Sequence, residues 1–380
     1  MNYQEAISFI QDTGWMGCKP GLKRIRELLD LLGNPQNNLK FIHIAGSNGK
    51  GSTSAMLSSI LTCAGYRTGL FTSPHLCRYN ERIKINNVDI SDEDLSSAAE
   101  KVSVAVKQMH DTPTEFERFT AIAFLHFQMC ACDIVVLEVG LGGRLDSTNV
   151  IPAPVLSIIT NIGLEHTDLL GDTLEKIAAE KAGIIKEGAS VILYEQSAQV
   201  ENVIRRKCAE CNCGLTVTDI AQEQLELLDM TGQTFSYRKR KNLRLNLLGT
   251  YQVYNVAVVL DAVDALNQRG FTVSEEDISK GLAHVVWPAR MELLGQEPPF
   301  LLDGAHNPQC MTALRDSLES IWPNTKIAFL TGVLADKEYT EMMNTLLPTA
   351  AAFFCLTPCS ERALPAEALA EYLRKQGADA

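Results

Sequence analysis

Short apolar runs alternate with amphipathic segments along most of the chain. The runs at 40–45, 133–139 and 155–160 are almost continuously apolar, and each leads into a loop containing glycine. Runs of this kind are typical of strands that are covered on both faces. Residues 52–64 and 250–267 instead have helical spacing. The alternation predicts an α/β fold with a mostly parallel sheet and helices on both faces.

One break in this pattern divides the chain into two parts. The 380 residues exceed what a single core usually serves. The sequence Gly-Gln-Glu-Pro-Pro at 295–299 interrupts the alternation, which then restarts and continues to a helix predicted at 365–376. We therefore predict a phosphate-loop-type domain, residues 1–294, and a smaller Rossmann-like α/β domain, residues 295–380.

The composition of the chain argues against nucleic acid and membranes as binding partners. The formal net charge is -12 and no basic stretch offsets it, so nucleic acid is not an expected partner. No apolar run approaches the roughly 20 residues that cross a bilayer, and residues 1–10 lack the pattern of a signal peptide. The 11 cysteines fit reduced thiols. We expect a cytoplasmic protein with small-molecule partners, no membrane partner and, by default, a monomeric state.

Residues 45–52 carry the strongest chemical signal. The sequence Ala-Gly-Ser-Asn-Gly-Lys-Gly-Ser joins a predicted strand to a predicted helix. Glycines let backbone N–H groups surround phosphate oxygens at the positive end of a helix. Lys50 is placed to reach the β- and γ-phosphates, and Ser52 to reach magnesium, although the spacing departs from the standard P-loop. We predict ATP phosphate binding, in preference to an ordinary glycine turn, by Gly46, Ser47, Asn48, Gly49, Lys50, Gly51 and Ser52.

Three residues at predicted strand ends are candidate metal ligands. Glu138 lies inside an apolar strand, where an unpaired carboxylate is costly, and magnesium prefers oxygen ligands. His166 follows the strand at 155–160, at the sheet edge where open α/β sheets bind ligands. Ser73 ends another short strand, and its position alone fits a structural role equally well.

Lys181 lies on an otherwise apolar helix face. We expect that helix to begin with Asp172 as a cap and Glu175 as its capping-box partner. Lys181 then shares a face with Ile177 and Ala178. Burial lowers the pKa of a lysine and leaves more neutral amine, which can add carbon dioxide to form a carbamate. From these residues alone, the simpler expectation is a lysine that extends to water.

The second domain offers a further group of candidates. Asp303 to Pro308, with the sequence Asp-Gly-Ala-His-Asn-Pro, forms a predicted strand-to-helix turn. The guanidinium of Arg290 suits a transferring phosphoryl group. Asp303 is suited to accept from a ribose hydroxyl or to order Arg290. Both roles require the two domains to close on one nucleotide.

Taken together, these segments resemble the folylpolyglutamate synthase and dihydrofolate synthase family, within the Mur ligase superfamily. The resemblance covers nearly the whole chain, with the motifs in the family's order. Beyond those above, the matching motifs are Lys19-Pro20-Gly21-Leu22-Lys23-Arg24-Ile25, Thr72-Ser73-Pro74-His75-Leu76, Gly163-Leu164-Glu165-His166-Thr167, Glu180-Lys181-Ala182-Gly183, Leu248-Gly249-Thr250-Tyr251-Gln252 and Gly332-Val333-Leu334-Ala335-Asp336-Lys337.

The resemblance implies an ATP-dependent ligase that adds L-glutamate to a folate through an acyl phosphate, with activity on dihydropteroate left open. It implies Mg²⁺ at Ser73, Glu138 and His166, and a carbamylated Lys181, which reverses the expectation drawn from the helix face. The implied catalytic residues are Lys50, Lys181 and His306, and further ATP contacts come from Asn255, Arg290 and Asp303. The implied substrate contacts are Thr114, Glu115, Phe116, Glu117 and Arg144, with Phe116 placed to stack on a pterin ring.

Three departures from the family pattern stand out. Ser47 replaces a usual threonine, and Tyr251 replaces a usual histidine. The chain stops after the helix at 365–376, so we expect a shortened second domain. A peptidoglycan ligase of the Mur type is not expected, since the 45 residues ahead of Gly46 are too few for a uridine-nucleotide domain. A non-catalytic ATP-dependent switch or folate-binding protein remains the alternative.

Overall fold

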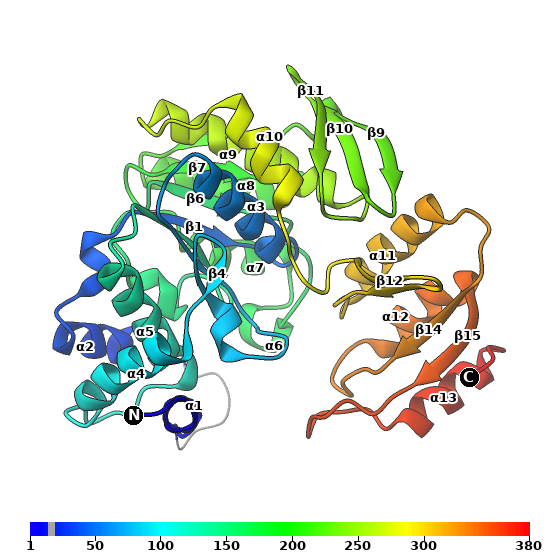
Figure 1. Cartoon of the computed structure of the whole chain (residues 1–380), viewed down its shortest axis with the longest axis horizontal. Coiled ribbons are helices and arrows are strands. Elements are labelled where there is room, and N and C mark those ends of the chain that lie inside the picture. The colour runs from blue at the N-terminus through cyan, green and yellow to red at the C-terminus, as the bar shows by residue number, and fades with distance from the viewer. Residues whose placement is uncertain (14–19) are drawn as a thin grey trace. The chain divides into compact units, whose positions relative to one another are not determined.

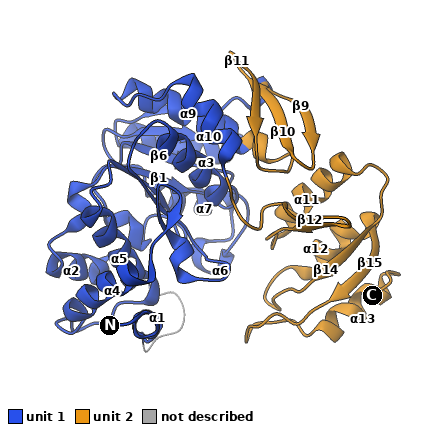
Figure 2. Cartoon of the chain, in the orientation of Figure 1, with its two compact units in different colours: residues 1–222, 255–285 blue, residues 223–254, 286–380 orange. Residues whose placement is uncertain are grey.

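The computed structural model describes residues 1–13 and 20–380, and Lys19 of the first family motif lies outside them. The described chain forms two compact units, coloured separately in Figure 2. The first comprises residues 1–222 and 255–285, and the second comprises residues 223–254 and 286–380. The second unit thus begins at 286 instead of the predicted 295, because the predicted cut falls inside a β-hairpin. It also takes in the segment 223–254, which forms a small sheet of its own.

An eight-stranded sheet organises the first unit (Figure 1). Its order is β4-β3-β2-β5-β1-β6-β7-β8; the β2–β3 and β3–β4 pairs are antiparallel, and the other neighbouring strands pair in parallel. Every residue of β1, β5 and β6 is buried, as their continuous apolar runs predict, and the predicted fold class is confirmed. The strands are β1 (Phe41–Ala45), β2 (Thr68–Phe71), β3 (Ile83–Ile85), β4 (Val88–Asp89), β5 (Ile134–Glu138), β6 (Leu156–Ile159), β7 (Ser190–Leu193) and β8 (Gly214–Val217).

Two apolar clusters attach helices to this sheet. One joins α1, α2, α4 and α5 to β1, β2 and β5, and the other joins α7 and α8 to β6 and β7. Within residues 1–13 and 20–380, no helix combines the length and apolar content that a membrane crossing requires. The helices are α1 (Tyr3–Gln11), α2 (Lys23–Leu31), α3 (Lys50–Cys63), α4 (Asp92–Val106), α5 (Glu115–Met129), α6 (Thr167–Leu170), α7 (Leu174–Ala182), α8 (Ala198–Glu210), α9 (Gln252–Gln268) and α10 (Glu275–His284).

The cap of α7 corrects one sequence expectation. Thr173, not Asp172, caps the helix, and its side chain accepts from the N–H of Lys176. The threonine hydroxyl is one residue closer to the first turn, which leaves Asp172 free to form an exposed ion pair with the Lys176 ammonium at 2.8 Å. The predicted helix is therefore present, but its capping box is not.

The second unit contains three small sheets and its own core. The antiparallel sheet β11-β10-β9 contains β9 (Glu223–Asp229), β10 (Gly232–Tyr237) and β11 (Arg240–Leu245). Strands β12 (Glu292–Gln296) and β13 (Pro299–Leu302) form a hairpin, while β14 (Ile327–Thr331) and β15 (Ala350–Cys355) pair in parallel. Helices α11 (Pro308–Ile321), α12 (Tyr339–Leu346) and α13 (Ala366–Lys375) complete it. Met311, Met342, Phe353 and Leu369 lie in its apolar core.

The loops that contain predicted site residues lie along one edge of the large sheet. Strands β2, β5, β1 and β6 are parallel neighbours, so their carboxyl ends lie along the same edge. The Gly46–Ser52 loop follows β1, Ser73 follows β2, the 140–146 loop follows β5, and the segment 160–166 follows β6. Residues far apart in the sequence therefore come together here.

Candidate functional site

The loop after β1 requires glycine at two positions. A Cβ atom on Gly46 would lie 1.8 Å from the Oγ1 atom of Thr160, so no side chain fits there. Gly49 has a φ of +88°, and a Cβ there would lie 2.5 Å from Oδ1 of Asn255. The predicted ATP contact Asn255, at the start of α9, therefore lies directly against the phosphate loop. Because α3 begins at Lys50, the loop meets a helix N-terminus, as the sequence predicts.

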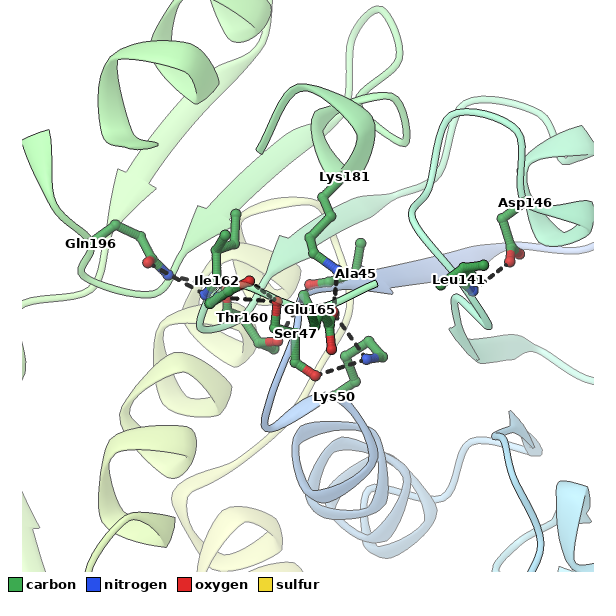
Figure 3. A network of polar contacts seen from close by, with 12 residues as sticks. Ala45, Ser47, Lys50, Leu141, Asp146, Thr160, Ile162, Glu165, Lys181 and Gln196 are labelled. Atoms are coloured by element: carbon green, nitrogen blue, oxygen red, sulfur yellow. Dashed lines mark hydrogen bonds and ion pairs between the residues drawn. The ribbon is translucent and has the colours of Figure 1, made fainter. Parts of the chain in front are cut away.

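Two lysines converge on the loop (Figure 3). Lys50 Nζ donates to the carbonyl oxygens of Gly46 at 2.8 Å and Ser47 at 3.1 Å. Lys181, from α7, also donates from Nζ to the Gly46 oxygen at 2.8 Å. Lys181 is only 1% exposed and forms an ion pair with Glu165 at 2.8 Å. The expectation of a lysine that extends to water is therefore wrong, because Glu165 supplies the partner that allows burial.

Burial and neighbouring charge change the acidity of this pair. Burial, together with the charge of Lys50, lowers the pKa of Lys181 to about 8, against the opposing charge of Glu165. At that pKa about a tenth of the amine is neutral at pH 7. Burial alone would raise the pKa of Glu165, but the charges of Lys181 and Lys50 outweigh it and the net change is downward. Sequence reasoning missed Glu165, although it directly precedes His166 in the loop that follows β6.

Two of the three predicted metal ligands lie together. Glu138, the last residue of β5, is 3% exposed and accepts from the backbone N–H of Ser73 at 3.3 Å. His166 is exposed and precedes α6 in a left-handed conformation, with a φ of 47°. No group of three or more His, Cys, Asp or Glu side chains in the described chain is arranged to hold a metal. A carboxylate and a hydroxyl are oxygen donors of the kind that Mg²⁺ prefers, and this ion usually keeps phosphates and water among its ligands.

The predicted substrate contacts line one cavity of about 830 Å³ in the first unit. This volume suits a small organic ligand. The cavity reaches Ser73, which follows β2, and the 140–146 loop, which follows β5, the neighbour of β1. Its lining includes all five predicted substrate residues, namely Thr114, Glu115, Phe116, Glu117 and Arg144.

The five residues hold different positions in the cavity wall. The ring of Phe116 packs against Gly140, where an added Cβ would lie 2.5 Å from the ring. Glu117 closes the capping box of α5 with Thr114 and is paired with buried Arg24 at 3.0 Å, so it fixes the wall. Arg144 is paired with Glu180 at 2.8 Å and is more than half exposed.

A buried carboxylate holds the 140–146 loop in shape. Asp146 accepts from the N–H of Leu141 at 2.9 Å, and from the N–H and hydroxyl of Thr148 at 2.9 and 2.5 Å. Nε2 of His43, on β1, lies 2.8 Å from the same hydroxyl oxygen. Because that hydroxyl donates to Asp146, His43 Nε2 must donate to it, which assigns the neutral Nε2–H tautomer. Burial, together with the charge of Lys186, lowers the pKa of His43.

The predicted nucleotide residues of the second unit also form an ordered turn. Asp303 accepts from the N–H of Met291 at 2.9 Å and of Ala305 at 2.7 Å, and from the Tyr251 hydroxyl at 3.4 Å. Burial raises the pKa of Asp303. The carboxylate thus orders the backbone next to Arg290. Tyr251, which replaces a usual histidine of the family, is thus one of the hydrogen-bond donors to Asp303.

Arg290 and His306 both lie next to Gly304. Arg290 Nη1 donates to the carbonyl of Ala289 at 2.8 Å, and a Cβ on Gly304 would lie 2.5 Å from that nitrogen. His306 is exposed and its Nδ1 lies 2.8 Å from the Gly304 oxygen. Glycine at 304 is therefore what lets the guanidinium lie close to the turn.

A phosphate loop beside a small-molecule cavity defines a nucleotide-binding α/β protein with a second ligand site. The Mur ligase middle domain matches residues 44–263, and the Mur ligase glutamate ligase domain matches residues 289–380. Dihydrofolate synthase/folylpolyglutamate synthase of Bacillus subtilis is 38% identical over 355 residues, which cover 90% of this chain and 82% of that protein. Folylpolyglutamate synthase of Lacticaseibacillus casei is 35% identical, covering 96% of this chain and 88% of that protein.

A solved structure agrees over the same length. E. coli FolC in complex with DHPP and ADP superimposes with a TM-score of 0.87 at 30% identity, covering 98% of this chain and 88% of that one. The chain belongs to the folylpolyglutamate synthase and dihydrofolate synthase family of Mur ligases.

Proposed function

We propose that this chain is an ATP-dependent ligase that joins L-glutamate to the carboxylate of a folate, and that dihydropteroate is the second acceptor to test. One observation carries the proposal. The cavity that gathers the predicted substrate residues reaches Ser73 and the loop after β5, and β5 is the neighbour of β1, which leads into the phosphate loop. A folate carboxylate held in this cavity would therefore face the nucleotide phosphates.

The chemistry proceeds in two displacements. A carboxylate is a poor acyl donor, so its oxygen first attacks the γ-phosphorus of ATP, and ADP leaves. The amine of glutamate then attacks the acyl carbon, gives up a proton and displaces inorganic phosphate, which leaves an amide. The N–H groups at the N-terminus of α3 and the Lys50 ammonium would stabilise charge on the phosphoryl group as it moves.

Magnesium fits the end of β5. Glu138 and Ser73 would hold the ion, with His166 as the third ligand that the family resemblance implies. When bound, Mg²⁺ would neutralise charge on the phosphates. Asn255 lies against the phosphate loop, and Arg290 and Asp303 are the proposed nucleotide contacts of the second unit. His306 is the proposed neighbour of the transferred phosphate.

Lys181 is the proposed site of a carbamate. Its neutral amine would add carbon dioxide and release a proton, and the pKa of about 8 leaves enough neutral amine for this step. The resulting anion would lie beside Glu165, so it requires a cation close by. Here the amine is paired with Glu165, which opposes carbamylation.

Lys181→Ala should lose activity, and short carboxylates should partly restore it. Lys181→Arg should stay inactive, because a guanidinium keeps its charge. NMR of the native enzyme under ¹³C-labelled carbon dioxide should show a carbamate signal that Lys181→Ala lacks. The same spectrum from both proteins would leave Lys181 as a cation paired with Glu165.

The proposed reaction is tested by phosphate release. Phosphate release that requires ATP, L-glutamate and either tetrahydrofolate or dihydropteroate supports the ligase. Omission of L-glutamate, or of the pterin acceptor, should abolish phosphate release. Release that continues without both would instead favour an ATP-dependent switch. Mass spectrometry of the products would then identify which acceptor carries the added glutamate. We place this reaction in the reducing cytoplasm, in keeping with the free thiols of the ten described cysteines.

A further inference from the structure

We propose that Arg82 binds the carboxylate of the acceptor substrate, and that His75, Tyr79 and Phe119 hold its guanidinium ready for that contact. The inference rests on the proposed function and assigns the anion-binding group within the cavity. Arg82 ends the 3₁₀ helix Tyr79–Arg82 and lines the cavity together with Ser73 and Glu115. It was not among the residues that the sequence singled out.

The guanidinium is held on three sides. Nε of Arg82 donates to Nδ1 of His75 at 2.8 Å. The guanidinium carbon lies 5.1 Å from the centre of the Tyr79 ring and 5.4 Å from that of Phe119. The rings of His75 and Tyr79 lie 4.4 Å apart and complete the support. A planar cation fixed in this way loses little freedom when its terminal nitrogens bind a ligand.

His75 supports the arrangement in its neutral form. Because Nδ1 accepts from Arg82, the neutral ring carries its proton on Nε2. The histidine therefore acts as an acceptor that orients the arginine, and it adds no charge of its own.

No carboxylate pairs with Arg82 within the described residues. Glu81, its neighbour in the chain, accepts the N–H groups of Leu76, Cys77 and Arg78 instead. Glu115 faces Arg82 electrostatically, but its carboxylate accepts the hydroxyl of Tyr79 at 2.8 Å. An arginine in a cavity wall whose acidic neighbours are engaged elsewhere is suited to an anionic ligand.

The backbone places Arg82 near the reacting end of the cavity. The N–H of Thr72 donates to the carbonyl of Arg82 at 3.0 Å, so Arg82 lies beside the strand end that leads into Ser73. Ser73 in turn donates to Glu138. A carboxylate bound by the Arg82 fork would therefore lie next to the proposed magnesium ligands. Arg144, the other arginine of the cavity, is already paired with Glu180.

Binding of two matched ligands tests this assignment without turnover. Calorimetry would compare pteroate with the analogue whose carboxylate is a carboxamide, on the full-length protein and on Arg82→Gln, Arg82→Lys and Arg78→Gln. Arg78 is the matched control, since it is more than half exposed, pairs with Asp92 and does not line the cavity. Wild type should prefer pteroate over the carboxamide by about 10- to 100-fold. Arg82→Gln should lose that preference, Arg82→Lys should keep part of it, and Arg78→Gln all of it.

Each alternative result contradicts a stated part of the proposal. If Arg82→Gln weakens both ligands equally, the residue only supports the wall, and if it weakens neither, Arg82 does not reach the ligand. If Arg82→Gln does not fold, as judged by its thermal midpoint, wild type is compared with Arg82→Lys instead. An undiminished preference of Arg82→Lys for pteroate over the carboxamide would then contradict the proposal. Wild type that binds pteroate and the carboxamide alike overturns this inference alone. Wild type that binds neither overturns the acceptor site of the proposed function as well.

Discussion

The loops after β1 and β5 follow similar strands, but they contact side chains of opposite charge. Both follow fully buried strands that are neighbours in the sheet, and both contain several glycines. The loop after β1 is backed by two ammonium groups, those of Lys50 and Lys181, which share the Gly46 oxygen. The loop after β5 is instead held by the buried carboxylate of Asp146.

The buried charge behind each loop decides what the loop can bind. Cations behind the first loop favour phosphate oxygens in front of it. In the first loop, the N–H groups of Ser47 and Asn48 donate to the carbonyl of Asn161, so the N-terminus of α3 is the part suited to phosphate. In the second loop, Asp146 accepts from the N–H groups of Leu141 and Thr148, so these donors are not available to an anion. That loop serves as the wall of an organic-ligand cavity. Glycine content alone therefore does not distinguish an anion site from a cavity wall.

Removal of Lys50 should have the largest effect. Lys50→Ala removes the ammonium beside the moving phosphoryl group, and kcat should fall by about 10²- to 10³-fold with little change in thermal midpoint. Lys176→Ala, which removes an exposed lysine of α7, is the control and should leave kcat unchanged. Near-normal turnover of folded Lys50→Ala would remove the loop after β1 from the nucleotide site.

Glu138 ends β5 directly ahead of the second loop, and its charge should set the magnesium requirement. Glu138→Gln keeps an acceptor for the Ser73 N–H but loses the negative charge. The Mg²⁺ concentration for half-maximal activity should rise at least about tenfold. Glu210→Gln, 68% exposed at the end of α8, should titrate like wild type. A matching titration for Glu138→Gln would place the metal elsewhere.

Substitution of Asp146 should affect the loop after β5 without affecting the loop after β1. Asp146→Asn replaces a carboxylate that accepts three hydrogen bonds with an amide that brings two donors into the same buried space. KM for the folate should rise by roughly 10-fold while KM for ATP stays within about twofold. If both constants rise together, the two loops do not act separately.

His43 links the two loops, and its effect should be the smallest. It belongs to β1 but is hydrogen bonded to Thr148, and its folded pKa is well below 6.5. The unfolded imidazole takes up a proton below about pH 6.5 and the folded one resists, so stability falls as pH drops below that value. This group contributes a slope of at most about 1.4 kcal/mol per pH unit.

His43→Gln keeps a donor for Thr148 but does not titrate. Urea unfolding of both proteins between pH 5 and 7 should therefore give a smaller loss of stability on acidification for His43→Gln. Parallel curves for the two proteins would show that His43 does not carry this pH dependence.

The sequence predicted the sheet and the strand–loop–helix geometry around residues 46–49 well because both signals are local. Continuous apolar runs at β1, β5 and β6, and a glycine loop ahead of α3, need no tertiary information. The pairing of Lys181 with Glu165 joins residues 16 apart across a loop and a helix, and only the fold brings them together. Arg82 and His75 lie close in sequence, but the apolar spacing around them gives no sign of a cavity. A single division of the chain could not show that residues 223–254 join the second unit, because only the fold brings them to it.

Oxygen transfer from substrate to phosphate tests the acyl-phosphate mechanism most directly. The acceptor carboxylate would be labelled with ¹⁸O, and the inorganic phosphate formed with ATP and L-glutamate would be analysed by mass spectrometry. Each turnover should place one ¹⁸O atom in the phosphate, because a carboxylate oxygen attacks the γ-phosphorus and leaves with it. Unlabelled phosphate accompanied by a correctly formed amide would contradict the acyl-phosphate mechanism.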